Sequence, residues 1–128
     1  MDGLTKTLPL LKELRILIVD DSAVVRSVLS KELLRSGVQV TQAENGQQAL
    51  DIALRKEFDL IITDVEMPCM NGIELCRRLK SDPRTQQIPI VILSSLDSEE
   101  DIRKGFLAGA STYITKAQAK ESLIETIE

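Results

Sequence analysis

Short apolar runs alternate along this chain with longer stretches in which apolar residues recur at helical spacing. The short runs are rich in β-branched residues, which is typical of strands. Four of the five show little alternation, as expected for strands covered on both faces, and the intervals between them allow helical crossovers. We therefore predict a parallel sheet with strands at Arg15–Val19, Val38–Gln42, Asp59–Thr63, Ile90–Leu93 and Thr112–Thr115.

A helix with an apolar side is predicted after each strand. Ser22 can cap the first helix and Gly37 can close it. The apolar residues of this helix are Val24, Val25, Val28, Leu29 and Leu33. Good N-terminal caps also precede the next three helices, at Asn45, Asn71 and Ser98.

The later helices have further start and stop signals. Asp82 and Pro83 end the third helix. Asp101 completes a capping-box-like start after Ser98, and the apolar residues of this fourth helix are Ile102, Phe106 and Leu107. A fifth helix is predicted at Gln118–Ile127.

Right-handed crossovers on five parallel strands give an α/β fold with helices on both faces of the sheet. The predicted architecture is a doubly wound, five-stranded (βα)5 sandwich of three layers, flavodoxin-like, with strand order 2-1-3-4-5. At 128 residues the chain has room for one domain, which we place at 15–128. Residues 1–14 show no sustained period and are interpreted as an N-terminal extension or linker.

Composition and charge narrow the functional classes. A net charge of −4 and 2% aromatic residues argue against a nucleic-acid partner. No apolar stretch approaches the roughly 18 residues of a membrane span, and no signal-peptide core is present, so we predict a cytoplasmic protein. The chain has no histidine, and Cys69 and Cys76 alone make an incomplete zinc site. We interpret both as reduced structural thiols.

The unusual polar residues lie just past the predicted strands. Asp20 and Asp21 follow the first strand, Asp64 the third, Ser94 the fourth and Lys116 the fifth. The carboxyl ends of parallel strands lie at one edge of a sheet, where folds of this kind bind ligands. The sequence therefore predicts that three carboxylates and one ammonium group meet there.

A divalent cation would neutralise this predicted site, because three carboxylates and one lysine leave a charge of about −2. Oxygen ligands without histidine or thiolate favour Mg2+, with Mn2+ as a substitute. With the metal and Lys116 in place, a carboxylate can act as an in-line nucleophile toward a phosphoryl group. The hydroxyl of Ser94 can then donate to a phosphoryl oxygen.

Each of these residues alone has an ordinary explanation. Asp20 and Asp21 can cap the following helix, and Asp64 can be a turn residue. Lys116 can be an ordinary surface lysine, Ser94 a loop hydroxyl and Tyr113 a partly buried aromatic residue of a strand. Their joint placement at the ends of four strands favours one shared site.

Four segments carry a family resemblance: Ile16-Leu-Ile-Val-Asp-Asp-Ser22, Asp64-Val-Glu-Met-Pro-Cys-Met-Asn-Gly72, Leu93-Ser-Ser95 and Gly109-Ala-Ser-Thr-Tyr-Ile-Thr-Lys116. Together they resemble the receiver domains of bacterial two-component response regulators. The resemblance implies a phosphoprotein that receives its phosphoryl group from a sensor histidine kinase or a histidine phosphotransfer protein. It also implies an effect on a downstream protein or an attached output domain. Such a module catalyses its own phosphorylation and dephosphorylation and turns over no separate substrate.

The resemblance also implies a role for each site residue. Asp64 resembles the residue that is phosphorylated, and Lys116 the lysine that contacts the phosphoryl group. Asp21, Asp64 and the backbone carbonyl of Glu66 resemble direct Mg2+ ligands, and Asp20 resembles a carboxylate that acts through metal-bound water.

Ser94 and Tyr113 resemble the hydroxyl and aromatic pair that couples phosphorylation to a surface on the predicted fourth helix and fifth strand. Ala117 departs from the family, which usually has proline there and often a cis peptide bond. A cis bond before a non-proline residue costs about 2.5–4 kcal/mol, so we predict a trans Lys116–Ala117 bond, or a strained one held by its surroundings. Glu66 and Leu96 occupy flanking positions, and we hypothesise that Glu66 disfavours an incoming anion unless the metal is bound.

Three other classes are alternatives. Asp64-Val65-Glu66 loosely resembles the paired acids of haloacid-dehalogenase-like phosphatases, although this chain lacks a cap and a second aspartate. A flavodoxin-like cofactor binder needs hydroxyls and glycines after the first strand, where this chain has acids. A scaffold domain that signals without phosphorylation is disfavoured by the complete set of acids.

Overall fold

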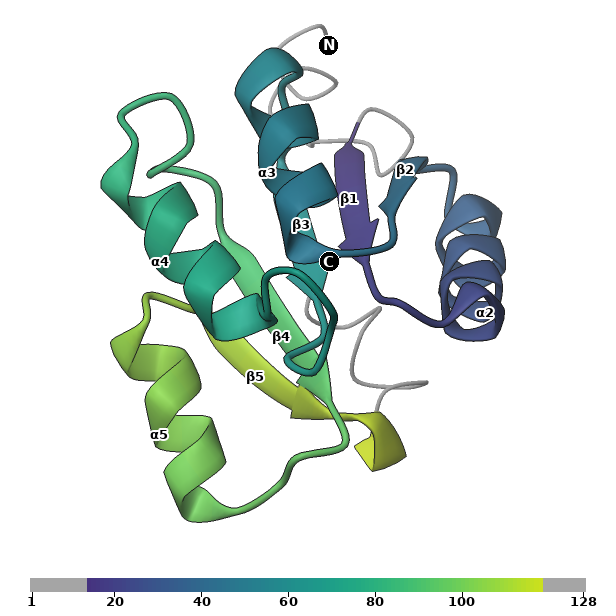
Figure 1. Cartoon of the computed structure of the whole chain (residues 1–128). Helices are drawn as coiled ribbons and strands as arrows, with labels where there is room; N and C mark the ends of the chain where they lie inside the picture. The colour runs from purple at the N-terminus through teal and green to yellow at the C-terminus, as the bar shows by residue number, and fades with distance from the viewer. Residues whose placement is uncertain (1–13, 119–128) are drawn as a thin grey trace, which may run out of the picture.

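Strands and helices alternate along the chain in the predicted order (Figure 1). The structure is a computed structural model, and it describes residues 14–118. Its elements are β1 (Arg15–Val19), α2 (Ala23–Arg35), β2 (Gln39–Ala43), α3 (Gly46–Arg55), β3 (Leu60–Thr63), α4 (Gly72–Ser81), β4 (Ile90–Ser94), α5 (Glu99–Leu107), β5 (Thr112–Thr115) and the short 3-10 helix η2 (Lys116–Gln118).

The five strands form one parallel sheet in the order β2-β1-β3-β4-β5. This confirms the predicted strand order and the flavodoxin-like fold class. β1 and β5 have the predicted bounds, whereas β2 begins and ends one residue later than predicted. The register explains the shift, because Gln39 pairs with Arg15 and Ala43 pairs with Val19.

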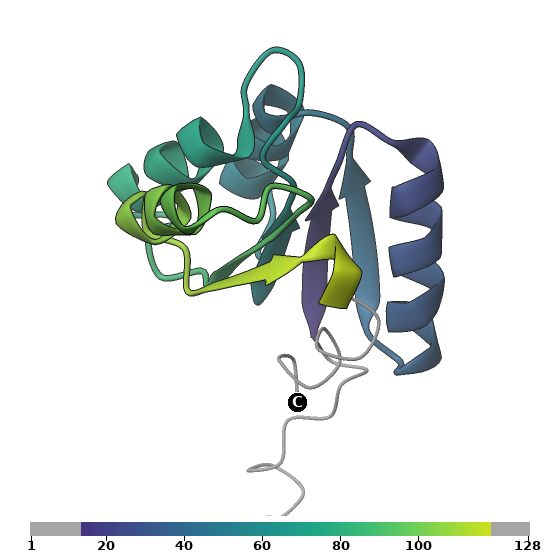
Figure 2. The same ribbon diagram turned by 90° about the horizontal axis from the view of Figure 1, so that it is seen from below.

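Helices cover both faces of the sheet, which gives three layers. Figures 1 and 2 show α2 on one face and α3, α4 and α5 on the other. Successive side chains of a strand point to opposite faces. Leu17 and Ile61 therefore belong to the core under α3 and α4, whereas Ile18 and Ile62 belong to the core under α2.

Side-chain caps determine where the helices begin. The Oγ atom of Ser22 accepts a hydrogen bond of 3.2 Å from the N–H of Val25. Gly37 has a φ of 88°, the left-handed conformation that commonly ends a helix. Asp82 is the C-terminal cap of α4. The other predicted N-terminal caps are also confirmed, at Asn45, Asn71 and Ser98.

Two helices expose part of the apolar side predicted from their periodicity. On α2, Leu29 and Leu33 are buried against the sheet, together with the polar Ser30. A helix packed on a sheet buries mainly the stripe that faces the strands. The apolar residues left exposed on α2 and α5 are Val24, Val28, Leu34, Phe106 and Leu107.

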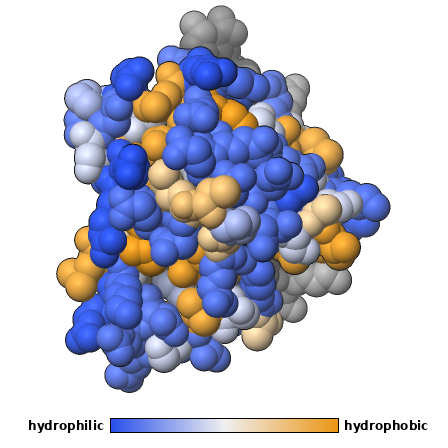
Figure 3. Space-filling view, in the orientation of Figure 1, coloured by the Kyte–Doolittle hydropathy of each residue, from blue (hydrophilic) through white to orange (hydrophobic). Residues whose placement is uncertain are grey.

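Two predictions fall on residues outside the described part of the chain. They are the extension at 1–14, apart from residue 14, and the helix at Gln118–Ile127, apart from Gln118 in η2. Among the described residues, no helix has the length and apolar character needed to span a bilayer. The face that carries α3, α4 and α5 is mainly hydrophilic, with apolar groups in small separate spots (Figure 3).

Candidate functional site

Carboxylates from two neighbouring strands gather at the carboxyl edge of the sheet. Asp20 and Asp21 follow β1 and Asp64 follows β3, and one oxygen of each lies within 4.8 Å of the others. Asp20 is 2% exposed and Asp64 is 7% exposed, whereas Asp21 is open to solvent. The strand order reverses between β1 and β3, which is where folds of this class bind ligands.

Lys116 lies against the two buried carboxylates. Its Nζ atom is 3.2 Å from Oδ2 of Asp20 and 3.2 Å from Oδ2 of Asp64. Burial acts to lower the pKa of Lys116, but the charges of Asp64 and Asp20 outweigh burial and raise this pKa above its ordinary value of 10.5. Lys116 is therefore a cation at neutral pH, and the three carboxylates still leave a charge of about −2.

Backbone hydrogen bonds hold Asp20 and Asp64 as continuations of the sheet. The N–H of Asp64 donates to the carbonyl of Val19 at 2.9 Å, and the N–H of Asp20 donates to the carbonyl of Ala43 at 3.1 Å. Oδ1 of Asp20 accepts a bond of 2.9 Å from the N–H of Ser22. Oδ1 of Asp64 likewise accepts from the next backbone N–H at 2.7 Å. Each carboxylate is thus fixed by one oxygen and presents the other to Lys116.

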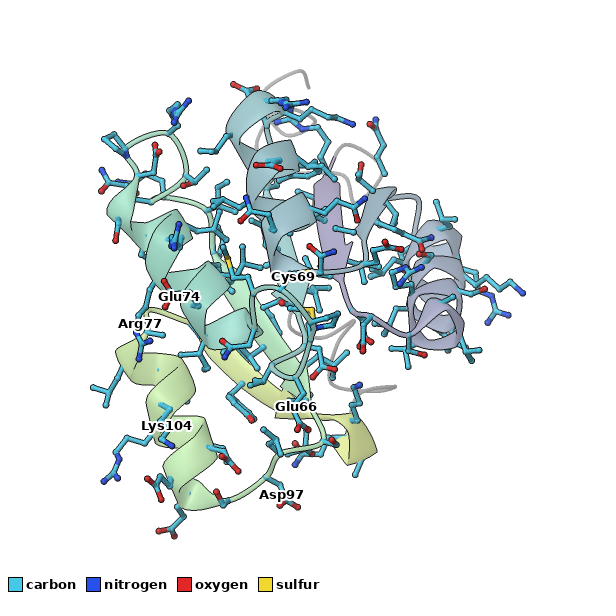
Figure 4. All side chains as sticks on the ribbon, in the orientation of Figure 1. Glu66, Cys69, Glu74, Arg77, Asp97 and Lys104 are labelled. Carbon is cyan, nitrogen blue, oxygen red and sulfur yellow. The ribbon has the colours of Figure 1, made fainter. Side chains whose placement is uncertain are left out.

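The donor set fits a hard divalent cation. The gathered ligand atoms are all carboxylate oxygens, which Mg2+ and Mn2+ prefer, and Asp21 is exposed to the solvent that would supply metal-bound water. The side chain of Glu66 does not belong to this group of carboxylates. It is exposed on the loop after β3 (Figure 4), and the role expected for Glu66 uses its backbone carbonyl instead.

Ser94 and Tyr113 are linked through the backbone of Leu96. The N–H of Leu96 donates to Oγ of Ser94 at 3.1 Å, and the hydroxyl of Tyr113 donates to the carbonyl of Leu96 at 2.6 Å. Burial raises the pKa of Tyr113 above its ordinary value of 10.0, so the hydroxyl is protonated and can donate. Leu96 stood out in the sequence only as an apolar flanking residue, because a backbone role leaves no side-chain signal.

Sequence reasoning missed two residues that shape this site. Arg26 on α2 donates from Nη1 to the backbone carbonyl of Asp20 at 2.6 Å and from Nε to Oε1 of Gln42 at 3.1 Å. Gly72 lies so close to Asp64 that a Cβ atom would overlap the Asp64 carbonyl oxygen. In the sequence, the only signs of these two roles are an arginine one turn into the first predicted helix and a glycine directly after the N-terminal cap Asn71.

Two further predictions concern Ala117 and the cysteines. The Lys116–Ala117 bond is trans as predicted, since the described residues contain no cis peptide bond. Cys69 and Cys76 are both free thiols. Cys76 is buried in the core, which raises its pKa to about 11 and keeps it neutral, whereas Cys69 is exposed on the loop between β3 and α4.

Comparison with known sequences places the chain in one family. The family model described as response regulator receiver domain matches residues 16–128. Protein PilH of Pseudomonas aeruginosa is 39% identical over 113 residues, which cover 88% of this chain and 93% of PilH. The gliding motility regulatory protein of Myxococcus xanthus is 44% identical over 110 residues, which cover 86% of this chain but 14% of that protein.

Solved structures agree with the sequence matches. The chemotaxis protein CheY4 of Vibrio cholerae superposes with a TM-score of 0.83 at 33% identity, covering 89% of this chain and 95% of CheY4. A putative response regulator from Chloroflexus aurantiacus gives a TM-score of 0.85 at 32% identity, covering 89% of this chain and 93% of the other.

Fold and site together define a doubly wound α/β domain with carboxylates and a lysine where the strand order reverses. The chain belongs to the family of response regulator receiver domains. Receiver domains of two-component systems are phosphorylated on an aspartate and generally depend on Mg2+. They are signalling modules that interact with histidine kinases and downstream effectors.

Proposed function

We propose that this domain accepts a phosphoryl group on Asp64, with Mg2+ bound, from a phosphohistidine donor. The donor is a sensor histidine kinase or a histidine phosphotransfer protein, and the reaction takes place in the cytoplasm. The observation that carries the proposal is the cluster of Asp20, Asp21, Asp64 and Lys116, in which one oxygen of each carboxylate lies within 4.8 Å of the others. The family resemblance assigns the nucleophile to Asp64.

In the proposed step, a carboxylate oxygen of Asp64 attacks phosphorus in line with the leaving group. An O–P bond forms and the P–N bond breaks, and the imidazole leaves with the electron pair and takes up a proton. Asp21, Asp64 and the backbone carbonyl of Glu66 would hold Mg2+ directly, and Asp20 would hold it through a water molecule. The bound cation would neutralise negative charge on the phosphoryl oxygens. Lys116 supplies a second positive charge 3.2 Å from Asp64, and Ser94 donates its hydroxyl to a phosphoryl oxygen.

Exposed apolar residues suggest where partners bind. Val24 and Val28 lie one turn apart on α2, directly after the acidic residues that follow β1. We assign them to the contact with the phosphoryl donor. Phe106 and Leu107 are exposed on α5, and with β5 they form the proposed output surface. Tyr113 on β5 would connect that surface to Ser94 and so report phosphorylation.

Acetyl phosphate with Mg2+, followed by intact-mass measurement, tests the acceptor. The wild type should gain the mass of one phosphoryl group, and Asp64→Asn should gain none. Asp97→Asn is the matched control, because Asp97 is an exposed aspartate on the loop before α5, outside the carboxylate cluster (Figure 4). It should react as the wild type does. Stoichiometric uptake by Asp64→Asn would overturn the proposal.

Two experimental outcomes would favour an alternative class over a receiver domain. Turnover of a small phosphomonoester by the wild type would favour a hydrolase over a receiver. A wild type that takes up no phosphoryl group with donor and Mg2+ in excess would favour a scaffold domain. Beryllofluoride with Mg2+, compared between the wild type and Asp64→Ala, shows whether occupation of the site changes the oligomeric state.

A further inference from the structure

Gly105 on α5 packs its bare backbone against the ring of Tyr113 on β5. A Cβ atom at position 105 would lie 2.8 Å from Cδ2 and 3.1 Å from Cε2 of Tyr113, and 2.9 Å from Cδ1 of Ile92. Carbon atoms do not pack that closely, because favourable separations are about 3.5–4.0 Å. Even alanine would therefore displace the helix, or both the Tyr113 ring and the end of the Ile92 side chain.

The helix itself gives no reason for a glycine at this position. Gly105 lies in the interior of the nine-residue α5, where glycine is the least favourable residue apart from proline. Its φ is not positive, in contrast to Gly37 and Gly109. The reason is therefore space: position 105 is buried, and the Tyr113 ring occupies the volume that a side chain would take.

The ring position determines which hydrogen bond Tyr113 can make. Its hydroxyl donates to the carbonyl of Leu96 at 2.6 Å, and the N–H of Leu96 donates to the buried Oγ of Ser94 at 3.1 Å. A continuous set of contacts thus runs from Gly105 through Tyr113 and Leu96 to Ser94. A ring pushed away from α5 would lose the Leu96 carbonyl.

We propose that Gly105 is a positioning residue that keeps open the slot for the Tyr113 ring and so couples α5 to the loop after Ser94. The steric part of this proposal, the contact between Gly105 and the Tyr113 ring, concerns the protein before phosphorylation. The link to phosphorylation rests on the proposed function, because it requires Ser94 to respond to a phosphoryl group on Asp64.

Tyr113 is well suited to a direct test, because the chain contains one tyrosine and no tryptophan. Intrinsic fluorescence and the ionisation of the phenol, followed by absorbance, therefore report this ring alone. In the Gly105→Ala variant without a phosphoryl group, the fraction of molecules with the hydrogen bond from Tyr113 to the Leu96 carbonyl should fall roughly two- to tenfold. The pKa of Tyr113 should move from its raised value toward 10.0. A spectrum and titration identical to those of the wild type would overturn the proposal.

Leu107→Ala is the matched control, since it also places alanine on α5 but at a side chain that is 79% exposed. Its tyrosine spectrum and titration should equal those of the wild type. A double-mutant cycle then tests direct contact. In a Tyr113→Ala background, Gly105→Ala should raise the urea midpoint, because alanine has the better helix propensity. With Tyr113 present, the same substitution should raise the midpoint less or should lower it. Additive effects would contradict contact through the ring.

The functional part is tested with acetyl phosphate or beryllofluoride and Mg2+. Gly105→Ala should reach the same phosphoryl mass as the wild type, because position 105 does not contact the carboxylates. Its change in tyrosine fluorescence on activation should be at least twofold smaller. A full wild-type response in Gly105→Ala would disprove the coupling. If the wild type itself takes up no phosphoryl group, the proposed function fails, while the spectra of the unmodified variants still decide the steric part.

Discussion

Gly72, the first residue of α4, lies directly against the backbone carbonyl oxygen of Asp64. A Cβ atom at position 72 would overlap that oxygen and would lie 3.1 Å from Cα of Val65. The N–H of Gly72 donates to the carbonyl of Val65 at 2.8 Å, and the N–H of Gly46 donates to the carbonyl of Met70 at 3.1 Å. Backbone contacts thus hold the loop that carries the candidate phosphoryl acceptor at both of its ends.

Gly72→Ala should therefore destabilise the domain and displace Asp64. The clash is with backbone, which cannot rotate away, so we expect the free energy of unfolding to fall by about 1–3 kcal/mol. Urea unfolding measures this change. Gln47→Ala is the control, because Gln47 is an exposed residue in the first turn of α3. Gly72→Ala with unchanged stability and normal phosphoryl uptake would show that the close approach is unimportant.

Mg2+ should stabilise the folded domain through the carboxylate cluster. A cation that binds only the folded state adds about 2.7 kcal/mol to the free energy of unfolding at 100 times its Kd. Asp21→Asn should lose most of this gain, and it should disturb the apo fold little because Asp21 is exposed. Asp97→Asn should keep the gain. Equal stabilisation of Asp21→Asn and the wild type, by thermal unfolding with Mg2+ or with a chelator, would place the cation elsewhere.

Lys116 should stabilise the domain at neutral pH and lose this effect in strong alkali. Breaking a fully buried ion pair costs about 3–5 kcal/mol, but the side chain of Lys116 is 31% exposed and solvent weakens its ion pairs. We therefore expect Lys116→Met to lower the free energy of unfolding by about 1–3 kcal/mol. The folded-state pKa is raised above 10.5, so the folded state retains this proton longer than the unfolded state. The contribution of Lys116 to stability is therefore complete below pH 10.5 and disappears as the pH rises through the raised pKa.

Urea unfolding of the wild type and Lys116→Met, from about pH 8 to about pH 11.5, measures this difference. Tyr113 and Cys76 also ionise in alkali, but they are present in both proteins and their effects cancel in the difference. The difference in free energy of unfolding between the two proteins should shrink as pH rises. A difference that stays constant or grows would contradict the assigned ion pairs.

The fold could be predicted from local signals, because apolar runs and helix caps act over a few residues. Ser22 and Asn45 begin their helices through bonds to backbone N–H groups three residues along. The convergence of Asp20 and Asp64 followed from topology alone, since parallel strands bring their carboxyl ends to one edge. These two levels were sufficient to locate the candidate site.

Contacts that depend on close three-dimensional approach could not be predicted in this way. The overlap that forbids a side chain at Gly72 involves a backbone oxygen of Asp64, and no sequence period encodes that distance. The bond from Arg26 to the Asp20 carbonyl depends on how α2 is oriented on the sheet. The same orientation decides that Val24 is exposed although it shares the apolar side of the helix.

Glu66 should make phosphoryl transfer more dependent on Mg2+. Its exposed carboxylate lies on the loop after β3, two residues past Asp64, and it repels an incoming dianion when no cation is bound. Two unit charges about 4 Å apart interact by about 1 kcal/mol in water, so repulsion of a dianion costs about 2 kcal/mol there, which limits the effect on rate to about thirtyfold. Glu66→Gln should therefore react up to that much faster at low Mg2+ and at the wild-type rate at saturating Mg2+. Glu57→Gln is the control, because Glu57 lies before β3 and pairs with Arg15 at the opposite edge of the sheet. Labelling rates that coincide for wild type and Glu66→Gln at every Mg2+ concentration would remove this role from Glu66.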